Sequence, residues 1–376
     1  MRNKKMSKRV FMKKMGGLAL SALPFWMWRE NAFAAAGAAG VEGFPARYAM
    51  TTPRGVRCQL CPNRCTIKEG EIGDCRARIN RNGELLTLAY GNPCAVHVDP
   101  IEKKPLNHFL PGTPSLSLAT AGCNLACLNC QNWQISQKRP DEVDTTELMP
   151  EQVEELARSK GCASVAYTYT EPIVFYEYTA DSAKLVHEKG MKNVIVSAGY
   201  IEEEPLRDWC RHIDGANIDL KSFDNNIYQQ LNAGTLDPVL NTLKVLKEEG
   251  VWVEITNLVI PDWTDDLDMI KKMSGWLVDN GFENAPLHFS RFTPTYKLDR
   301  LPATPVETLD KAREIARNAG MKFVYIGNVP GHEAQDTYCP ACEKKLIDRS
   351  GYRVGETNIT DGKCDFCGEP IAGVWE

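Results

Sequence analysis

The chain has 376 residues, 43% of them hydrophobic and 25% charged, with a formal net charge of -5. This length and composition predict a folded protein with one large hydrophobic core and small appended modules, and they exclude a chain that is disordered along its length. Charges of both signs are mixed along the sequence, so no broad basic face predicts binding to nucleic acid.

The first 36 residues have the pattern of a signal peptide. Residues 4–14 are basic, residues 15–28 are apolar, and Ala32-Phe33-Ala34 offers a small-residue cleavage site. Residues 7–13 resemble a twin-arginine export signal with a lysine in place of its first arginine. We therefore expect the protein to be exported or membrane-associated, or cytoplasmic if the signal is not used. An uncleaved amphipathic membrane anchor is the alternative interpretation.

The rest of the chain divides into four predicted parts. A linker rich in alanine and glycine covers 37–55, a cysteine-rich segment covers 56–114, a large α/β part covers 115–335, and a small cysteine-containing module covers 336–376. In the cysteine-rich segment, Asn82-Gly83 precedes alternating apolar residues, which predicts a hairpin.

The α/β part alternates short apolar runs with helical stretches. The predicted strands are Leu116–Ala119, Val165–Tyr169, Asn193–Ser197, Ala216–Leu220, Val251–Val259, Leu287–Phe292 and Phe323–Ile326. The predicted helices are Pro150–Lys160, Val174–Glu188, Glu203–Ile213, Pro238–Glu249, Asp266–Asn280 and Pro305–Ala319. Glycine follows five of them, at Gly161, Gly190, Gly250, Gly281 and Gly320. The pattern predicts a parallel sheet, doubly wound or in a complete or partial barrel, with reactive groups at the C-terminal strand ends.

Most of the 14 cysteines fall into three tight groups. The groups are Cys58/Cys61/Cys65/Cys75, Cys123/Cys127/Cys130 and Cys339/Cys342/Cys364/Cys367. Close pairs in a large enzyme-like chain indicate metal sites more often than disulfides. Of the three cysteines outside the groups, Cys162 and Cys210 are expected to be buried small apolar residues, whereas Cys94 has no predicted role.

The central group, Cys123-x3-Cys127-x2-Cys130, lies directly after the first predicted strand of the α/β part. Three thiolates on a 4Fe–4S cluster leave one iron open to an exogenous ligand. An amino acid can chelate that iron through its amine and carboxylate, which holds a sulfonium group against the cluster. A zinc knuckle or a ferredoxin loop is the alternative, but each requires a fourth ligand. The spacing therefore favours an open cluster.

This spacing resembles the signature of the radical SAM superfamily, in which it occupies the first loop of a partial barrel. Further segments resemble the AmmeMemoRadiSam-system radical SAM enzymes, relatives of the pyruvate formate-lyase activating enzymes: residues 99–106, 108–112, 127–133 and 288–292. The resemblance covers about residues 56–375 and implies a partial (β/α) barrel of the radical SAM type, carrying a 4Fe–4S cluster and S-adenosylmethionine.

The resemblance also implies a set of residues that bind S-adenosylmethionine: Thr170, Glu171, Ser197, Asp219 and Lys221. Glu171 and the following proline match the end of the family's Gly-Gly-Glu-Pro segment, and a carboxylate suits the ammonium group of the cofactor. Asp219 and Lys221 resemble the Asp-x-Lys of activating enzymes, and Ser197 lies in a turn that approaches the ribose. The alternatives are a first-turn carboxylate for Glu171, a solvated ion pair for Asp219 and Lys221, and a simple helix entry for Ser197.

Two polar residues near the end of the sixth predicted strand, His288 and Arg291, are candidates for lining a substrate pocket. Buried structural hydrogen bonding is the equally plausible alternative.

The C-terminal group consists of two C-x2-C pairs, Cys339/Cys342 and Cys364/Cys367. Such pairs are typical of a zinc ribbon or rubredoxin-like module, in which each pair supplies two thiolates to a tetrahedral metal. Zinc in a structural role is expected, with a redox iron or the docking of a substrate protein left open.

The N-terminal group, Cys58-x2-Cys61-x3-Cys65-x9-Cys75, supplies four thiolates within a short segment. Both zinc and a second 4Fe–4S cluster satisfy this pattern, and we favour zinc slightly.

The resemblance implies an enzyme that reductively cleaves S-adenosylmethionine to a 5'-deoxyadenosyl radical, which abstracts hydrogen from a substrate. The substrate is a protein glycine, by analogy with the activating enzymes, or a small molecule or another protein. A flavodoxin- or ferredoxin-type electron donor is expected as a partner, and the family name implies Memo-like and Amme-type proteins. The alternative is a non-catalytic iron–sulfur electron carrier or assembly factor. The export signal favours this alternative, whereas the Glu-Pro and Asp-x-Lys segments argue against it.

Overall fold

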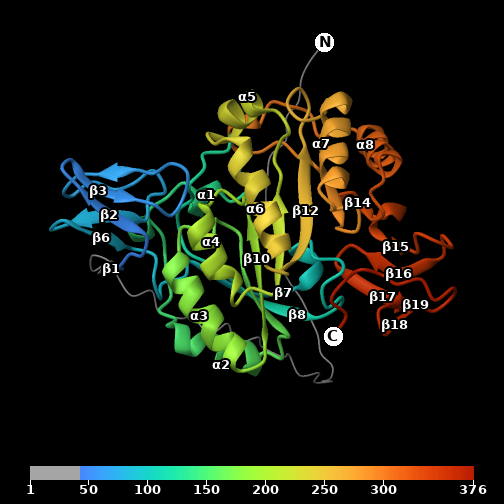
Figure 1. Ribbon diagram of the computed structural model, residues 1–376, viewed down its shortest axis with the longest axis horizontal. Helices are drawn as coiled ribbons and strands as arrows, with labels where there is room; N and C mark the ends of the chain where they lie inside the picture. The colour runs from blue at the N-terminus through green and yellow to red at the C-terminus, as the bar shows by residue number, and fades with distance from the viewer. Residues whose placement is uncertain (1–42) are drawn as a thin grey trace, which may run out of the picture. The chain divides into compact units, whose positions relative to one another are not determined.

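An eight-stranded sheet with the order β14-β13-β12-β11-β10-β9-β8-β7 forms the centre of the protein. The computed structural model describes residues 43–376, so the predicted signal peptide at 1–36 lies outside the described residues. The strands are β7 (Ala95–Pro100), β8 (Pro114–Ala119), β9 (Ser164–Tyr167), β10 (Lys192–Ser197), β11 (Gly215–Asp219), β12 (Trp252–Val259), β13 (Leu287–Arg291) and β14 (Val324–Gly327). Figure 1 shows the sheet changing in colour from teal at β8 to orange at β14.

Every neighbouring pair of strands from β8 to β14 is parallel, and only β7 runs antiparallel, against β8. The edges of the sheet, β7 and β14, do not pair with each other, so the barrel is partial. The parallel strands are buried almost throughout, which explains their apolar runs without alternation. The predicted partial (β/α) barrel is confirmed.

Helices connect the parallel strands in chain order, and neighbouring helices contact each other in pairs, α2 with α3, α4 with α6 and α7 with α8. The helices are α1 (Trp133–Ser136), α2 (Pro150–Ser159), α3 (Tyr176–Glu188), α4 (Glu203–Cys210), α5 (Asn225–Ile227), α6 (Leu236–Glu248), α7 (Leu267–Asp279) and α8 (Val306–Ala319). The five glycines predicted to follow helices all have positive φ angles, between 68° and 113°, a conformation that glycine adopts without steric cost.

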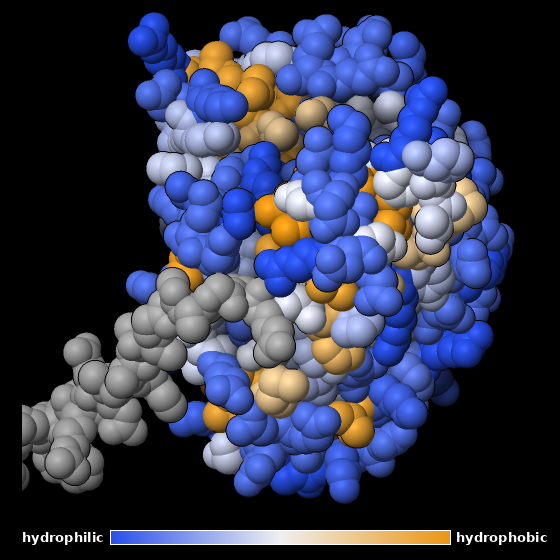
Figure 2. Space-filling view, turned by 90° about the vertical axis from the view of Figure 1, so that its left-hand side faces the viewer, coloured by the Kyte–Doolittle hydropathy of each residue, from blue (hydrophilic) through white to orange (hydrophobic). Residues whose placement is uncertain are grey.

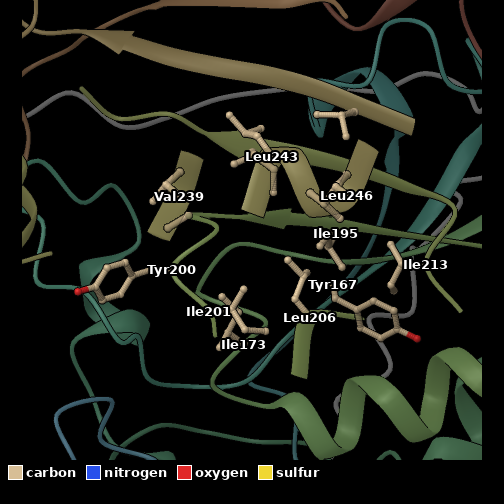
Figure 3. Packing of buried hydrophobic residues seen from close by; sticks show 14 of the residues in the cluster. Tyr167, Ile173, Ile195, Tyr200, Ile201, Leu206, Ile213, Val239, Leu243 and Leu246 are labelled. Atoms are coloured by element: carbon tan, nitrogen blue, oxygen red, sulfur yellow. The ribbon is translucent and has the colours of Figure 1, made fainter. Parts of the chain in front are cut away.

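Apolar faces of the helices pack onto the strands. Figure 3 shows part of this core, where Val239, Leu243 and Leu246 of α6 lie near Ile195 of β10 and Tyr167 of β9. Parallel sheets require this cover because both of their faces must be removed from water. The arrangement leaves the strand ends as the places where polar side chains gather.

The segment before the barrel forms two small antiparallel sheets, ordered β2-β3-β4 and β1-β6-β5. Their strands are β1 (Phe44–Pro45), β2 (Ala49–Thr52), β3 (Gly55–Cys58), β4 (Thr66–Ile67), β5 (Arg78–Arg81) and β6 (Glu84–Thr87). β5 and β6 form the predicted hairpin, and Asn82 and Gly83 have φ angles of 55° and 78°, as a tight hairpin turn requires. β1 and β2 lie within the predicted linker at 37–55, so ordered structure is already present there.

The C-terminal module contains a sheet ordered β15-β16-β17 and a β18-β19 pair, with the strands β15 (Thr337–Tyr338), β16 (Lys345–Ser350), β17 (Arg353–Thr357), β18 (Ile359–Thr360) and β19 (Lys363–Cys364). His108 joins this module to the barrel. Its Nε2 lies 2.6 Å from the hydroxyl of Tyr325 in β14, and its Nδ1 lies 2.7 Å from the carbonyl oxygen of Ala372. These contacts give the segment 108–112 a structural role.

None of the helices between residues 43 and 376 has the length and apolar character that a membrane crossing requires. Figure 2 shows one side of the molecule, where hydrophilic residues cover most of the surface and apolar residues form several separate groups.

Candidate functional site

The three-cysteine loop begins immediately after β8 and lies against the N-terminal cysteine-rich segment. Gly122 has a φ angle of +104°, and a Cβ atom there would lie 2.6 Å from the carbonyl oxygen of Cys75. Glycine is therefore required, because any side chain would collide with this backbone. In the loop that follows, the amide of Leu125 donates a hydrogen bond to Cys123 Sγ at 3.4 Å.

The other two sulfurs of the loop also have polar partners. The Nδ2 of Asn232 donates to Cys127 Sγ at 3.2 Å, and Cys130 Sγ hydrogen-bonds with Ser136 Oγ at 3.1 Å. Hydrogen bonds to the sulfurs stabilise the negative charge of a thiolate-ligated cluster and tune its potential. The three cysteines therefore have surroundings that fit a 4Fe–4S cluster.

A short π-helix, Tyr228–Asn232, accepts backbone hydrogen bonds from this loop. The carbonyl oxygen of Asn232 accepts a hydrogen bond from Ala126 at 3.0 Å, and that of Leu231 accepts one from Leu128 at 2.9 Å. π-Helical turns are uncommon and occur frequently at functional sites. The sequence analysis missed Asn232, because no local pattern connects it with a loop more than 100 residues earlier.

Burial raises the pKa of two of the loop thiols, those of Cys123 and Cys127. The pKa of Cys123 lies well above its ordinary value because of burial, with a further increase from the nearby charge of Glu171. Burial also raises the pKa of Cys127, but the positive charge of Lys221 opposes the increase. These thiols therefore need a metal to hold them as thiolates. Glu171 and Lys221, two of the predicted cofactor-binding residues, lie close enough to interact with them electrostatically.

Glu171 is buried beyond the end of β9, with an exposed fraction of 2%. Its Oε1 accepts a hydrogen bond from Ser197 Oγ at 2.7 Å, and its Oε2 accepts one from the amide of Ala198 at 2.8 Å. Burial raises the pKa of Glu171 to about 7, although these hydrogen bonds favour the charged form. The structure thus brings Glu171 and Ser197 together next to the loop, while the hydroxyl of Thr170 turns away to donate to the carbonyl oxygen of Thr120 at 2.8 Å.

Asp219 ends β11, and Lys221 follows it by two residues. Lys221 Nζ lies 2.9 Å from Asp219 Oδ2, and the two side chains are 21% and 36% exposed, respectively. Burial disfavours the charge on Lys221, but Asp219 and Cys127 together raise its pKa well above the ordinary value. This ion pair is therefore not an ordinary solvated one, because Cys127, a predicted cluster ligand, is part of its surroundings.

Tyr169 occupies the position before Thr170 with a positive φ angle of 65°. This turn directs its hydroxyl to the carboxylate of Asp99. The buried Lys104 donates to the same carboxylate at 2.6 Å, and its ammonium lies 4.8 Å from the centre of the Tyr169 ring. Burial lowers the pKa of Lys104 to about 8, against the opposing effect of Asp99. The segment 99–106 thus supports the strand end that carries Glu171.

His288 and Arg291 make structural contacts in this fold. His288 is the second residue of β13, and its Nε2 lies 2.6 Å from Oε2 of the fully buried Glu254. That carboxylate also accepts hydrogen bonds from the amides of residues 107 and 108. The Nε of Arg291 donates to the carbonyl oxygen of Thr304 at 2.8 Å. The contacts of His288 thus lie towards the N-terminal ends of the strands, whereas the three-cysteine loop follows a C-terminal strand end.

The C-terminal cysteine group is compact. Its four Sγ atoms all lie within 4.8 Å of one another, with Cys339 and Cys367 3.6 Å apart and Cys342 and Cys364 3.8 Å apart. A tetrahedral metal with bonds of about 2.3 Å holds its sulfurs about 3.8 Å apart, so the group fits one such ion.

The N-terminal cysteine group surrounds a cavity that Arg78 and Asn124 also line. Outside the three groups, Cys162 and Cys210 are each 8% exposed, so their predicted burial is confirmed. Cys94 is half-buried just before β7, where its amide donates to the carbonyl oxygen of Ala119.

Comparison with known proteins agrees with this geometry. Residues 117–273 match the Radical SAM superfamily. The uncharacterized protein MJ0808 of Methanocaldococcus jannaschii is 47% identical over 318 residues, which cover 84% of this chain and 95% of that protein. The pyruvate formate-lyase 1-activating enzyme of Escherichia coli strain K12 is 25% identical over 54% of this chain and 89% of its own length. The structure of Streptococcus suis SuiB bound to S-adenosylmethionine has a TM-score of 0.46 and 13% identity, and the match covers 64% of this chain and 56% of that chain. The chain belongs to one family with MJ0808, carries a radical SAM domain at residues 117–273, and is related more distantly to the pyruvate formate-lyase activating enzymes.

Proposed function

We propose that this protein is an enzyme that cleaves S-adenosylmethionine reductively and uses the product radical to abstract hydrogen from a substrate. Cys123, Cys127 and Cys130 would hold the 4Fe–4S cluster. When bound, the cluster supplies the electron that splits S-adenosylmethionine into methionine and a 5'-deoxyadenosyl radical. The observation that carries the proposal is the gathering of Glu171 and Lys221 around these cysteines.

The chain's own residues bind and orient the cofactor. The carboxylate of Glu171 is the group for the ammonium of S-adenosylmethionine, and the donors Ser197 and Ala198 hold that carboxylate in one orientation. Asp219 and Lys221 form a preformed pair that would bind other polar groups of the cofactor. The buried Glu171 and Ser197 exclude water from their side of the site, which protects a reactive radical from side reactions.

We infer a substrate from which the radical removes a hydrogen atom bonded to carbon. The relation to pyruvate formate-lyase activating enzymes supports a protein backbone glycine as the first candidate, and a small molecule or another protein is the second. A cleft beside the three-cysteine loop, with a volume of about 530 Å³, is large enough to admit a peptide segment or a small molecule. Arg76, Arg139 and Asp74 are among the residues that line it.

The other features belong to the same proposal. The close sulfurs of the C-terminal group support zinc in a structural role. A flavodoxin- or ferredoxin-type protein would supply the electron. Memo-like and Amme-type proteins remain proposed partners, and export through the twin-arginine-like pattern at 1–36 remains the proposed localisation.

The competing function is a non-catalytic iron–sulfur electron carrier or assembly factor, which the export pattern favours. Equilibrium binding of S-adenosylmethionine to the anaerobically reconstituted protein separates the two functions. We expect about one cofactor bound per chain in the wild type and in the buried-cysteine control Cys162→Ala, and none in Cys127→Ala. A cluster-loaded wild type that binds no S-adenosylmethionine would support the carrier.

A further inference from the structure

Four cysteines of the N-terminal segment surround a single cavity. Cys58 ends β3, Cys61 and Cys65 lie in the turn between β3 and β4, and Cys75 precedes β5. All four side chains line the same cavity, together with apolar residues. We infer that Cys58, Cys61, Cys65 and Cys75 bind a second 4Fe–4S cluster, and not zinc.

The distances between the sulfurs distinguish the two kinds of site. A zinc ion lies at the centre of its four thiolates, so neighbouring sulfurs are about 3.8 Å apart. An iron–sulfur cube separates its ligands by the cube itself, so their sulfurs are roughly 6 Å apart. The C-terminal group has the short spacing, with all of its sulfurs within 4.8 Å. The sulfurs of the N-terminal group do not form such a compact group, and their side chains surround a cavity instead.

The radical SAM cysteines provide an internal reference. Cys123, Cys127 and Cys130 are the ligands of the first cluster in the function proposed above, and their three sulfurs likewise do not form a compact group. In the part of the chain that the structure describes, the compact arrangement of sulfurs is thus found in the C-terminal group and not in the other two.

The cavity has the size that a cluster needs. The centre of a water molecule can occupy a volume of about 20 Å³ inside the cavity. If this volume is a sphere, its radius is about 1.7 Å. Adding the radius of the water molecule itself gives a free space roughly 6 Å across. A zinc ion bonded at about 2.3 Å to four sulfurs leaves no such space between them.

A buried cation, itself paired with Glu177, contacts one sulfur at the cavity. Arg78 is 1% exposed, and its Nη1 donates to Cys58 Sγ at 3.6 Å. Arg78 also lines the cavity, and its Nε is buried without a hydrogen-bond partner. Four thiolates ligate all four irons of a cube, so this site has no open iron and is not a second site for S-adenosylmethionine.

The second cluster would be a neighbour of the first. The guanidinium of Arg76 donates to the carbonyl oxygen of Cys123 at 3.2 Å, and Asn124 lines the cavity of the N-terminal group. Cys75 makes the close backbone approach to Gly122 described above. The two cysteine groups are therefore joined by direct contacts.

The test uses the full chain with Cys123, Cys127 and Cys130 all replaced by alanine. The protein is reconstituted anaerobically with iron, sulfide and zinc, and the iron, acid-labile sulfide and zinc per chain are measured. We expect about four iron, about four sulfide and about one zinc. We also expect an electron paramagnetic resonance signal after dithionite reduction that S-adenosylmethionine does not change. An iron-free chain with about two zinc ions would overturn the inference.

If the triple variant does not fold, the metal content of the wild type tests the second cluster. About eight iron with one zinc per chain supports a second cluster, and about four iron with two zinc contradicts it. Replacing Cys58 and Cys61 by serine should halve the iron content, whereas the control replacement of Cys162 and Cys210 should leave it unchanged. The iron and zinc contents do not depend on the cleavage of S-adenosylmethionine. They would therefore be the same if the protein did not cleave S-adenosylmethionine.

Discussion

The guanidinium of Arg78 and the carboxylate of Glu177 form a fully buried ion pair, with Nη2 and Oε1 2.5 Å apart and exposed fractions of 1% and 0%. Arg78 begins β5 in the cysteine-rich segment, and Glu177 lies in the first turn of α3 in the barrel. The same carboxylate oxygen accepts the backbone amide of Arg47 at 2.7 Å. The pair therefore fastens the cysteine-rich segment to the barrel and holds a cation beside Cys58.

Glu177→Gln should destabilise the protein strongly. It leaves a buried guanidinium without its counter-charge, which typically costs roughly 3–5 kcal/mol. Thermal unfolding of the anaerobically purified protein measures the effect. The control is Glu307→Gln, which breaks an exposed pair with Lys311 in α8 and should change the midpoint little. Equal midpoints for the two variants would contradict a fastening role for Glu177.

Asn232→Ala should lower the reduction potential of the cluster that responds to S-adenosylmethionine. The hydrogen bond from Asn232 to Cys127 Sγ stabilises the reduced cluster, which carries the more negative charge. The variant removes this hydrogen bond. A hydrogen bond worth about 1 kcal/mol corresponds to about 40 mV for one electron. A redox titration followed by electron paramagnetic resonance measures the shift. Asn241→Ala, which removes an exposed contact with Glu203, is the control and should leave the potential unchanged.

Lys221→Met should weaken the binding of S-adenosylmethionine roughly tenfold or more, because a charged hydrogen-bonding partner is lost at the site. The variant keeps the length and apolar stem of the side chain. Lys192→Met is a matched control: Lys192 pairs with Asp214 at 3.2 Å and begins β10, at the opposite end of the strands. Unchanged affinity in Lys221→Met, measured by equilibrium binding, would remove Lys221 from the site.

In His108→Gln, the free energy of unfolding should decrease less at low pH than it does in the wild type. Burial lowers the pKa of His108 to about 4, from about 6.5. Between these values the unfolded chain binds a proton that the folded chain does not, so stability falls as the pH decreases from 6.5 towards 4. The loss is about 2 kcal/mol at pH 5. Denaturant midpoints at pH 7.5 and pH 5 should therefore differ less for the variant than for the wild type. An identical pH dependence in both proteins would exclude His108 as the titrating group.

The alternating strands and helices could be predicted from the sequence because apolar runs and glycine ends are local signals. The three-cysteine loop could also be recognised in the sequence, since its cysteines lie within eight residues. The predicted second strand extended to Tyr169, but β9 ends at Tyr167. The positive φ angle of Tyr169 turns the chain there so that its hydroxyl reaches Asp99.

Contacts between distant residues could not be predicted from local patterns. The antiparallel edge strand β7 contains exposed as well as buried residues, so it lacks the apolar run of its neighbours. Asn232 lies 105 residues after the cysteine whose sulfur it contacts. His288 is polar, as a site residue would be, but it forms a buried hydrogen bond with Glu254, 34 residues earlier, and so has a structural role. Each of these contacts depends on the folded arrangement of the strands.

The most direct test of the central claim is the reductive cleavage of S-adenosylmethionine. The anaerobically reconstituted protein lacking residues 1–36 is reduced with dithionite and mixed with S-adenosylmethionine, and 5'-deoxyadenosine and methionine are measured by chromatography. We predict release of both products in equal amounts by the wild type and by Cys162→Ala, and no release by Cys127→Ala. A wild type that holds a reduced cluster at Cys123, Cys127 and Cys130 and binds the cofactor, but releases no 5'-deoxyadenosine, would contradict the claim.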